Sequence, residues 1–428
     1  MTPLIILLII LVLILNIYLF SKAKRLSIHI LSLFFLVVSS YYLLLTPSVY
    51  YFTEEWYAVN TNVKNYWDLG MLMLLVHFTF YTIGYFLFNN TRHLEYDFSS
   101  LEARSSIGYL IEKKIFFIFL ILYCIIFLNT LSDGINLIDI FLGEHGGPTL
   151  GLKGGSYYLQ NFADSLIALL ILGFFFKIRR QYMLIMFLLA IPLFLILGFR
   201  YRIILTIFGF AIVYFYDNPI RPIVFVKSVL ALLVFLYAML LLTHNRAAIF
   251  MQEFDKISYD YKEFPYNALL HQAKGSLMDF AMYRAVDKNI VEIDYGETMI
   301  VYPIIKAIPS SFFKGGVKPY PSPQLKAIDT SISAGREVGE AVTSIGASFF
   351  AFYYPGVAIF AFATGAIIRK LQKNIGKSTY SFMTSISIVL SLFMWMTRGY
   401  MPGFIDHLAY MLIPIIILRV ISLRRVYK

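Results

Sequence analysis

The sequence contains few charged residues and almost no cysteine. Only 14% of its 428 residues are Asp, Glu, Lys or Arg, which is far below the share in soluble domains. A single cysteine, Cys124, excludes an intramolecular disulfide. The seven histidines are scattered, and no DxD, HExxH or GxSxG sequence occurs. We therefore expect no metal site, no cofactor and no nucleophilic serine or cysteine.

Long hydrophobic runs are what the chain has instead. Hydrophobic residues make up 59% of it, and the mean hydropathy is +0.72. A helix needs about 20 mostly apolar residues to cross a bilayer. We expect spans near 3–20, 26–45, 68–88, 115–131, 162–177, 182–198, 203–216, 223–243, 341–368, 380–396 and 404–421. The sequence thus predicts an all-α, polytopic membrane protein with about eleven transmembrane helices, the first of which is not a cleaved signal peptide.

Positive charge marks one side of this predicted bundle. Short loops after odd-numbered spans hold most of the Lys and Arg residues, from Lys22 to the C-terminal Arg425, whereas the alternate loops hold few. The positive-inside rule then places the N-terminus outside and the C-terminus in the cytoplasm. Contact with anionic lipid accounts for much of the net charge of +11. Because the basic residues are dispersed over many loops, we expect no nucleic-acid partner.

One long insert interrupts the spans on the predicted extracytoplasmic side. It separates an N-terminal transmembrane bundle (1–243) from C-terminal transmembrane helices (341–428), and we call the insert itself (244–340) the outer loop. Loops longer than about 15 residues usually carry function. We expect the outer loop to hold short helices and to act as a lid over a cavity in the outer leaflet.

The outer loop has internal patterns of its own. Its first part is acid-rich and its second part is basic. Apolar spacing predicts an amphipathic helix over 266–286, with Asp279 on the polar face. The apolar run from Met299 to Ile308 is too short to span a membrane, so we expect a re-entrant or surface-lying element there.

Charged residues gather at the predicted outer ends of the spans. Placing an arginine within a membrane costs free energy, so such a residue suggests function by default. Each of these arginines could also extend to the membrane interface or pair with a neighbouring carboxylate. Guanidinium groups bind phosphate oxygens bidentately, so we expect some of these side chains to hold a diphosphate. The predicted diphosphate-binding residues are Arg200, Arg202, Arg246, Arg336, Arg398 and Lys318. The predicted general bases are Glu340, Asp406 and His407.

Short motifs follow one another from roughly residue 190 to residue 370. They are Gly198-Phe199-Arg200, Gly296-Glu297-Thr298, Ile308-Pro309, Lys318-Pro319, Thr343-Ser344-Ile345-Gly346 and Tyr354-Pro355-Gly356. Together with the many spans and the large outer loop, this order resembles that of the bacterial Wzy-type O-antigen and capsule repeat-unit polymerases. Ala347 stands where members of that family often have a carboxylate, which makes Glu340 the substitute base in this chain.

The resemblance implies a GT-C-like glycosyltransferase of the bacterial inner membrane. Such an enzyme would use undecaprenyl-diphosphate-linked oligosaccharides as donor and acceptor, without a metal, to build lipopolysaccharide or capsule. Its arginines would hold the diphosphate while an acceptor hydroxyl attacks the anomeric carbon. The partners that it implies are the lipid bilayer, a polysaccharide chain-length regulator and a flippase.

Other functions stay open at the level of sequence. A transporter or flippase for a lipid-linked glycan would be expected to show inverted repeats or broken helices at the middle of the membrane, and no repeat is visible. An O-antigen ligase would share the donor site and differ only in its acceptor. A structural membrane subunit would leave the long outer loop unexplained.

Overall fold

The computed structural model describes most of the chain as helices. The described residues are 1–21, 29–58, 61–87, 100–132, 161–196, 201–218, 275–314, 342–375 and 378–426, together with Lys227, Leu230, Val234, Tyr237, Leu270 and Ala273. A two-residue hairpin pairs β1 (Tyr57–Ala58) with β2 (Thr61–Asn62) in antiparallel register. The rest of the regular structure in these residues is helical.

Six helices among the described residues are long and apolar enough to cross a membrane. They are Thr2–Ser21, Ile30–Phe52, Lys64–Leu87, Ser344–Asn374, Thr379–Arg398 and Met401–Ile421. Each overlaps one of the predicted spans, so the predicted class of an all-α membrane protein is confirmed. The total of about eleven spans and the lid role of the outer loop stay predictions.

Four further helices lie where spans are predicted. They are α5 (Ser100–Ser132), α8 (Ala163–Phe175), α9 (Arg180–Ile196) and α10 (Tyr201–Asp217). At 13 and 17 residues, α8 and α9 are shorter than the roughly 20 residues that a perpendicular crossing needs. Nearly all of the predicted span 223–243 lies outside the described residues.

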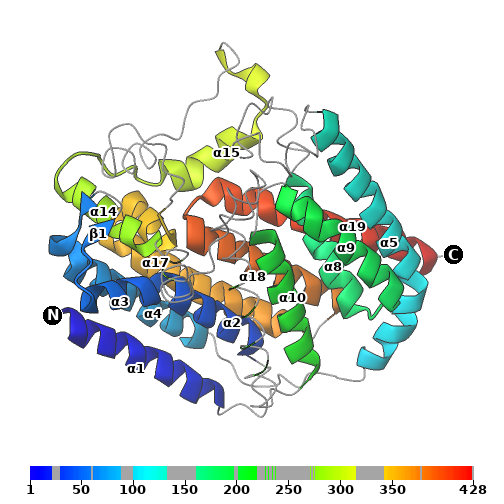
Figure 1. The fold of residues 1–428 in the computed structure, drawn as a ribbon, viewed down its shortest axis with the longest axis horizontal. Coiled ribbons are helices and arrows are strands. Elements are labelled where there is room, and N and C mark those ends of the chain that lie inside the picture. Colours follow the sequence, from blue (N-terminus) through cyan, green and yellow to red (C-terminus); the bar gives the residue numbers. More distant parts are fainter. Residues whose placement is uncertain are drawn as a thin grey trace, which may run out of the picture. The chain divides into compact units, whose positions relative to one another are not determined.

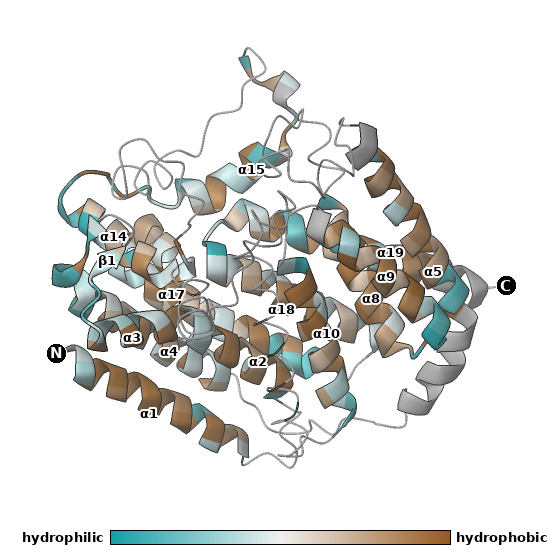
Figure 2. Ribbon diagram, in the orientation of Figure 1, coloured by the Kyte–Doolittle hydropathy of each residue, from teal (hydrophilic) through white to brown (hydrophobic). Residues whose placement is uncertain are grey.

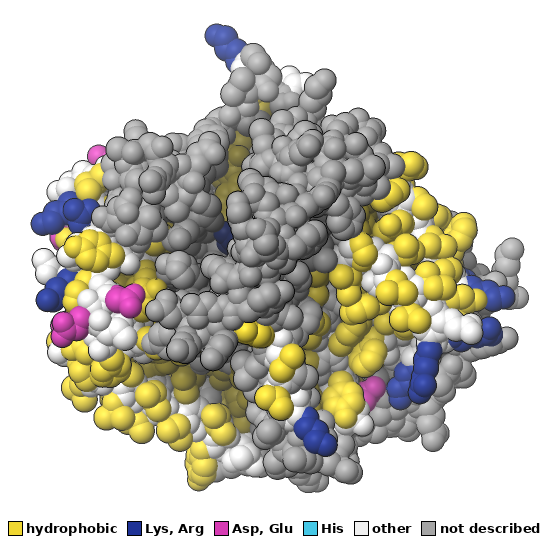
Figure 3. Space-filling model, viewed as in Figure 1, with side chains coloured by type: hydrophobic (Ala, Val, Ile, Leu, Met, Phe, Trp, Pro, Cys, Tyr) yellow, Lys and Arg dark blue, Asp and Glu magenta, His cyan; other side chains and the backbone are white. Residues whose placement is uncertain are grey.

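The surfaces of these helices are apolar. Figure 2 shows hydrophobic residues along almost the whole of α1 (Thr2–Ser21) and α8. Many large side chains are exposed on the helices, including Leu7 and Ile14 on α1 and Leu188 on α9. In Figure 3 hydrophobic side chains dominate the described part of the visible face. Exposed apolar surface of this extent is what a lipid-facing helix presents.

The chain divides into two compact units. Unit 1 comprises Met1–Leu94, Leu269–Asn374 and Ser391–Ile405, and unit 2 comprises Glu95–Ala268, Ile375–Leu390 and Asp406–Lys428. Helices α18 (Thr379–Arg398) and α19 (Met401–Val426) have residues in both.

In unit 1 the long helices α4 (Trp67–Leu87) and α17 (Ser344–Asn374) pack closely against each other, and α1 packs on α4. Glycines allow this approach from both sides. A Cβ atom at Gly84 would lie 2.1 Å from the carbonyl oxygen of Phe362, and one at Gly365 would lie 2.2 Å from that of Tyr81. Small residues at helix contacts are typical of membrane bundles, because close backbones gain van der Waals contact.

Polar groups inside unit 1 pair between helices. The side-chain amide of Asn16 on α1 donates to Thr82 Oγ1 on α4 at 2.7 Å. The segment from Ile30 to Phe52 runs as α2 (Ile30–Ser39), a π-helical turn (Ser40–Leu45) and α3 (Thr46–Phe52). The hydroxyl of Thr46 donates to the carbonyl of Leu270 at 3.0 Å, so it ties this segment to the start of the outer-loop helices.

The described part of the outer loop consists of short helices in unit 1. They are α14 (Gly275–Asp287), a π-helical turn (Glu297–Val301), α15 (Tyr302–Ala307) and a 3-10 turn (Ser310–Phe312). Figure 1 shows α14 beside β1 and the start of α17. The ring of Phe280 on α14 lies edge-to-face with Trp67, and it occupies the position that a Cβ at Gly70 would need.

Unit 2 is built around α8. This helix packs against α5, α9 and α10, and 12 of its 13 residues are buried. A Cβ atom at Gly209 of α10 would come within 2.2 Å of Ile171 on α8. The buried Glu112 of α5 pairs with Arg179 Nε at 3.0 Å, just before α9 begins. Other helices of the protein therefore surround nearly all of α8. A charged residue on α8 can be retained because protein groups, and not lipid, lie around it.

The glycine contacts between α4 and α17 give a testable prediction. Gly84→Ala and Gly365→Ala should each lower the free energy of unfolding by about 1–3 kcal/mol, because the added methyl meets backbone atoms that cannot move aside. Thermal unfolding of the purified protein in detergent measures this. Gly403→Ala is the matched control, since its Cβ would approach only the Tyr400 ring, at 3.1 Å. Unchanged stability of both test variants would contradict the close contact.

Candidate functional site

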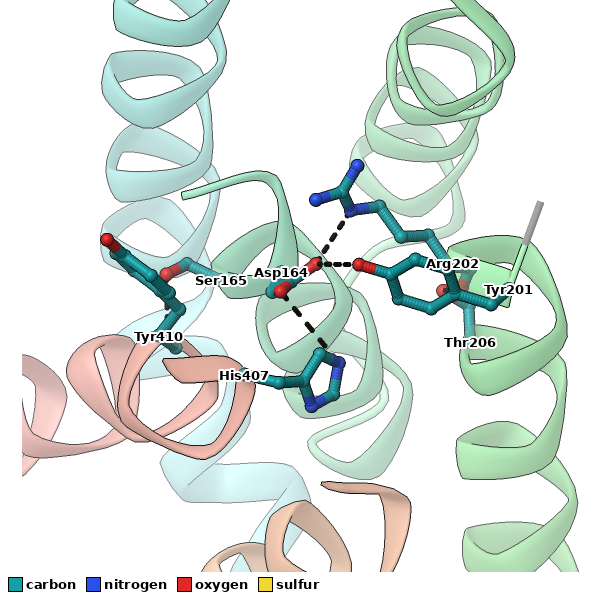
Figure 4. A network of polar contacts seen from close by, with 7 residues as sticks. All are labelled: Asp164, Ser165, Tyr201, Arg202, Thr206, His407 and Tyr410. Atoms are coloured by element: carbon teal, nitrogen blue, oxygen red, sulfur yellow. Dashed lines mark hydrogen bonds and ion pairs between the residues drawn. The ribbon is translucent and has the colours of Figure 1, made fainter. Parts of the chain in front are cut away.

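Unit 2 contains a buried charged cluster carried by three helices. Asp164 lies on α8, Tyr201 and Arg202 lie on α10, and His407 lies on α19 (Figure 4). We call these four residues the Asp164 network. The side chain of Arg202 is completely buried, and Asp164 and His407 are each 3% exposed. The structure therefore brings together two residues predicted from the sequence, Arg202 and His407, around a carboxylate that was not predicted.

The local sequence explains why these charges need one another. Asp164 is in the first turn of α8, where the helix dipole stabilises a carboxylate. Arg202 is also in the first turn of its helix, where the dipole opposes a cation. A buried arginine in that position requires a counter-charge, because the loss of hydration costs several kcal/mol per ion. Asp164 supplies it.

The geometry of the Asp164 network is specific. Arg202 Nε donates to Asp164 Oδ1 at 2.6 Å, and the Tyr201 hydroxyl approaches the same oxygen at 3.4 Å. His407 Nε2 lies 4.0 Å from Asp164 Oδ2, which is an ion-pair distance if the histidine is protonated and too long for a direct hydrogen bond. The Arg202 guanidinium also lies 5.3 Å from the centre of the Tyr201 ring.

Further contacts fix the three helices around the network. The hydroxyl of Ser165 donates to the carbonyl of Tyr410 at 2.6 Å, which joins α8 to α19. The ring of Tyr410 also lies edge-to-face with Phe162, with 4.9 Å between centroids. The hydroxyl of Thr206 donates to the Arg202 carbonyl at 2.8 Å within α10. The network is therefore held from both sides of Asp164.

Asp164 was overlooked at the level of sequence, although a signal was present. It is the one carboxylate inside the predicted span 162–177. An ionisable residue within a span suggests function by default and should be assigned a partner. The sequence alone allows each arginine to pair with a neighbouring carboxylate instead of serving function, and Arg202 does form such a pair. Its partner is 38 residues away in the chain, so no local pattern indicated which carboxylate it would be.

Of the remaining predicted site residues, the structure describes Asp406 and Arg398. Asp406 precedes His407 on α19 and is half-buried, so it projects from a different side of the helix. Arg398, at the end of α18, is exposed and belongs to unit 1. Arg200, Arg246, Lys318, Arg336 and Glu340 lie outside the described residues. Their predicted roles stay predictions.

Unit 1 holds a buried carboxylate of its own, Asp279 on α14, which is 1% exposed. Its Oδ1 accepts a hydrogen bond from the N–H of Thr343 at 2.7 Å, and its Oδ2 accepts one from the Thr343 hydroxyl. It thereby caps the N-terminus of α17 from outside that helix. A Cβ atom at Gly346 would lie 2.2 Å from Asp279 Oδ1, so the glycine admits the carboxylate.

This position corrects the predicted amphipathic helix. Helix α14 begins at Gly275, most of 266–274 lies outside the described residues, and Asp279 is not on a solvated polar face. Ten of the eleven residues from Ser276 to Val286 are buried, because α14 packs on α17, α4 and β1 at once. Burial raises the pKa of Asp279 from 3.8 to about 7, although the hydrogen bonds from Thr343 act in the opposite direction.

Two of the motifs that carry the family resemblance have structural tasks here. Gly296 adopts a φ of +85°, and the carboxylate of Asp294 accepts hydrogen bonds from the N–H groups of Gly296 and Thr298. The Thr343–Gly346 motif forms the capped start of α17. Both motifs shape the backbone around α17.

The chemical capacity of the Asp164 network is anion binding next to a proton carrier. Arg202 offers a fixed guanidinium, and His407 can accept or release a proton beside Asp164. Within the described residues, no three His, Cys, Asp or Glu side chains are arranged to hold a metal ion. Charge stabilisation in this network would come from Arg202 and from the starts of α8 and α10.

Removing the carboxylate should expose the cost of the buried arginine. Asp164→Ala leaves Arg202 as an uncompensated buried charge and should lower the free energy of unfolding by about 3–5 kcal/mol. The double variant Asp164→Leu/Arg202→Met should recover most of that loss, because no charge then remains buried. Thermal unfolding in detergent is the measurement, with exposed Asp68→Ala as the control. A double variant no more stable than Asp164→Ala would contradict the pairing.

The raised pKa of Asp279 predicts a pH dependence. Between pH 3.8 and about 7 the folded protein keeps a proton on Asp279 that the unfolded chain has released. Its stabilising effect is full below that window and is lost as the pH rises through about 7. The unfolding midpoint of the wild type should therefore fall, relative to that of Asp279→Asn, between about pH 5 and about pH 8. Exposed Glu297→Gln should give no such difference, and parallel pH profiles for wild type and Asp279→Asn would refute the burial of a titrating carboxyl.

No protein-family model, curated protein or solved structure matches the chain. Its function therefore has to be inferred from the membrane helices and from the Asp164 network.

Proposed function

We propose that the chain is a membrane glycosyltransferase that polymerises undecaprenyl-diphosphate-linked oligosaccharide repeat units into a cell-surface polysaccharide. The observation that carries this proposal is the Asp164 network, in which a fully buried arginine is held beside a carboxylate and a histidine among apolar helices. A structural subunit has no evident need for such a costly cluster. A transferase that acts on an anionic lipid does need one.

The orientation of Arg202 suits a diphosphate. Its Nε donates to Asp164 Oδ1, and in Figure 4 no dashed line joins either terminal nitrogen to the carboxylate. Asp164 thus fixes the plane of the guanidinium. The edge formed by the two terminal nitrogens has the geometry for a bidentate contact with phosphate oxygens. The N-terminal turns of α8 and α10, which bear Asp164 and Arg202, add partial positive charge at the same place.

The proposed reaction is a displacement at the anomeric carbon of the donor glycan. The acceptor hydroxyl oxygen forms the new bond to that carbon, and the bond from the carbon to the lipid diphosphate breaks. Arg202 offsets the negative charge that develops on the leaving diphosphate. His407 takes the proton of the attacking hydroxyl, and Asp164 stabilises the imidazolium that results. Asp406 and Glu340 are the alternative bases.

The finer features of the sequence reading belong to the same proposal. We place about eleven spans in the bacterial inner membrane, with the N-terminus outside, a GT-C-like arrangement and residues 244–340 as a lid. Arg200, Arg246, Lys318, Arg336 and Arg398 would bind the diphosphate with Arg202 at the outer face. The partners would be the lipid bilayer, a polysaccharide chain-length regulator and a flippase.

The decisive experiment is incubation of the purified protein with a lipid-linked repeat unit. Ladders of polymer should form with the wild type, and Arg200, Arg246, Arg336 or Arg398 changed singly to Ala should abolish them at normal protein level. Arg202→Lys keeps a positive charge beside Asp164 but loses the planar edge, so polymer yield should fall about 10- to 100-fold while the fold is retained. Arg179→Lys, an ion-paired arginine of the same unit, is the matched control.

Three results would contradict the proposal. Full-length polymer from every arginine variant would exclude the diphosphate-binding role. An absence of ladders with the wild type, together with movement of the lipid-linked glycan across liposomes, would identify a transporter. Transfer of a finished glycan to a different acceptor, without ladders, would identify a ligase.

A further inference from the structure

Helix α17 contains a backbone break that an ordinary helix lacks. Phe352 and Tyr353 depart from helical angles, and Tyr353 adopts φ 59° and ψ −150°, a region that is essentially restricted to glycine. The freed carbonyl of Phe350 accepts a hydrogen bond from the N–H of Asp294 at 3.2 Å. A Cβ atom at Gly356 would lie 2.2 Å from the Ser348 carbonyl oxygen. The break is therefore built into its surroundings and is not a frayed end.

The break turns two tyrosine rings outward. Tyr353 is 36% exposed and Tyr354 is 40% exposed, and their rings meet edge-to-face with 4.2 Å between centroids. Buried Phe349 contacts both rings, at 4.9 Å and 5.4 Å between centroids. The two rings thus form a rigid aromatic surface that is supported from inside unit 1.

A hydrogen-bonded carboxylate lies on the helix that packs against this part of α17. Asp287 is the exposed last residue of α14, one turn after Tyr283, whose ring lies 4.5 Å from that of Phe349 between centroids. The hydroxyl of Tyr66 donates to Asp287 Oδ2 at 2.7 Å. The aromatic pair and the hydrogen-bonded carboxylate therefore lie on two helices that pack together in unit 1. We call Tyr66, Asp287, Tyr353 and Tyr354 the tyrosine surface.

We propose that the tyrosine surface binds the saccharide part of the substrate, as the place where the acceptor glycan rests. Aromatic faces stack on the C–H faces of sugar rings, and an oriented carboxylate accepts hydrogen bonds from neighbouring hydroxyls. The assignment to the acceptor rests on the proposed function. Saccharide binding by these residues does not depend on the proposed function, because it follows from the aromatic rings and the carboxylate themselves.

The observations favour a saccharide over a membrane-interface anchor. Tyrosines that anchor a helix at the interface serve equally well on regular helical backbone. Here a strained conformation is kept at a tyrosine, although a glycine would adopt it without cost. The rings also pack on Phe349, which contacts the helix that ends at Asp287. Strain retained at a side chain that contributes little to burial points to binding.

Titration of soluble oligosaccharides into the purified protein tests the proposal. The probes are maltohexaose, cellohexaose, chitohexaose and the oligosaccharide released by mild acid from the lipid extract of the producing cells. The wild type should bind at least one of them. Tyr353→Gly and Tyr354→Ala should each weaken that binding about five- to tenfold, since each removes one stacking ring. Tyr353→Phe should retain it.

Controls separate binding from folding. Tyr353→Gly removes the strain, so its unfolding midpoint should not drop by more than that of Tyr354→Ala. Tyr214→Ala removes a tyrosine of the same 40% exposure from unit 2 and should bind like the wild type. The proposal is overturned if no probe binds the wild type, if Tyr353→Gly and Tyr354→Ala bind as tightly as the wild type, or if Tyr214→Ala loses binding equally.

A labelling experiment decides between water and lipid as the surroundings of the rings. Because Cys124 is the only cysteine, Tyr354→Cys in a Cys124→Ser background carries a single thiol. It should react with a membrane-impermeant maleimide in intact membranes, and the bound oligosaccharide should slow that reaction. A thiol that does not react would identify a lipid-facing anchor and overturn the proposal.

The outcome is distinguishable from a failure of the proposed polymerase. Arg202→Lys should lower polymer yield and keep oligosaccharide binding, whereas Tyr354→Ala should lower polymer yield and weaken oligosaccharide binding. Oligosaccharide binding without any polymerisation by the wild type would leave a saccharide-binding membrane protein of another function.

Discussion

A charge inside an apolar helical protein is tolerated only where another group offsets its lost hydration. The pair between Arg202 and Asp164 is the clearest instance, since both side chains are buried and the contact is 2.6 Å. The pair also determines the packing around it, because α8 must stay against α10 to keep it. In unit 1 Asp279 meets the same requirement by capping the start of α17. Buried polar pairs of this kind thus restrict which helix ends can pack together.

The same constraint produces the chemistry that we propose. Asp164 accepts a hydrogen bond from Arg202 Nε, which fixes the plane of the guanidinium (Figure 4). His407 shares that carboxylate, so anion binding and proton transfer would depend on one residue. Unit 1 offers a different chemistry, aromatic rings at the break in α17 and Asp287 on the helix that packs against it. An enzyme that joins lipid-linked glycans requires recognition of both a diphosphate and a sugar.

The sequence predicts the parts of this fold that depend on local composition. Spans such as 68–88 and 380–396 coincide with α4 and α18, because apolar length suffices to indicate a membrane helix. The sequence also indicates Arg202 and His407, since charge is rare in such segments. It does not indicate their shared partner Asp164, nor the burial of Asp279, because both depend on helices distant in the chain. At the break in α17 the Phe350 carbonyl accepts a hydrogen bond from the N–H of Asp294, and Gly356 lies against Ser348. The first of these contacts joins distant segments, so no periodicity indicates the break.

Binding of the lipid carrier itself tests the central claim most directly. Native mass spectrometry of the purified protein with undecaprenyl diphosphate and with undecaprenol compares two ligands that share a tail and differ only in the charged head. Diphosphate recognition predicts that undecaprenyl diphosphate is retained, that undecaprenol is not, and that Arg202→Lys weakens the difference. Equal retention of the two lipids by the wild type would show that only the tail is recognised, and it would contradict the account.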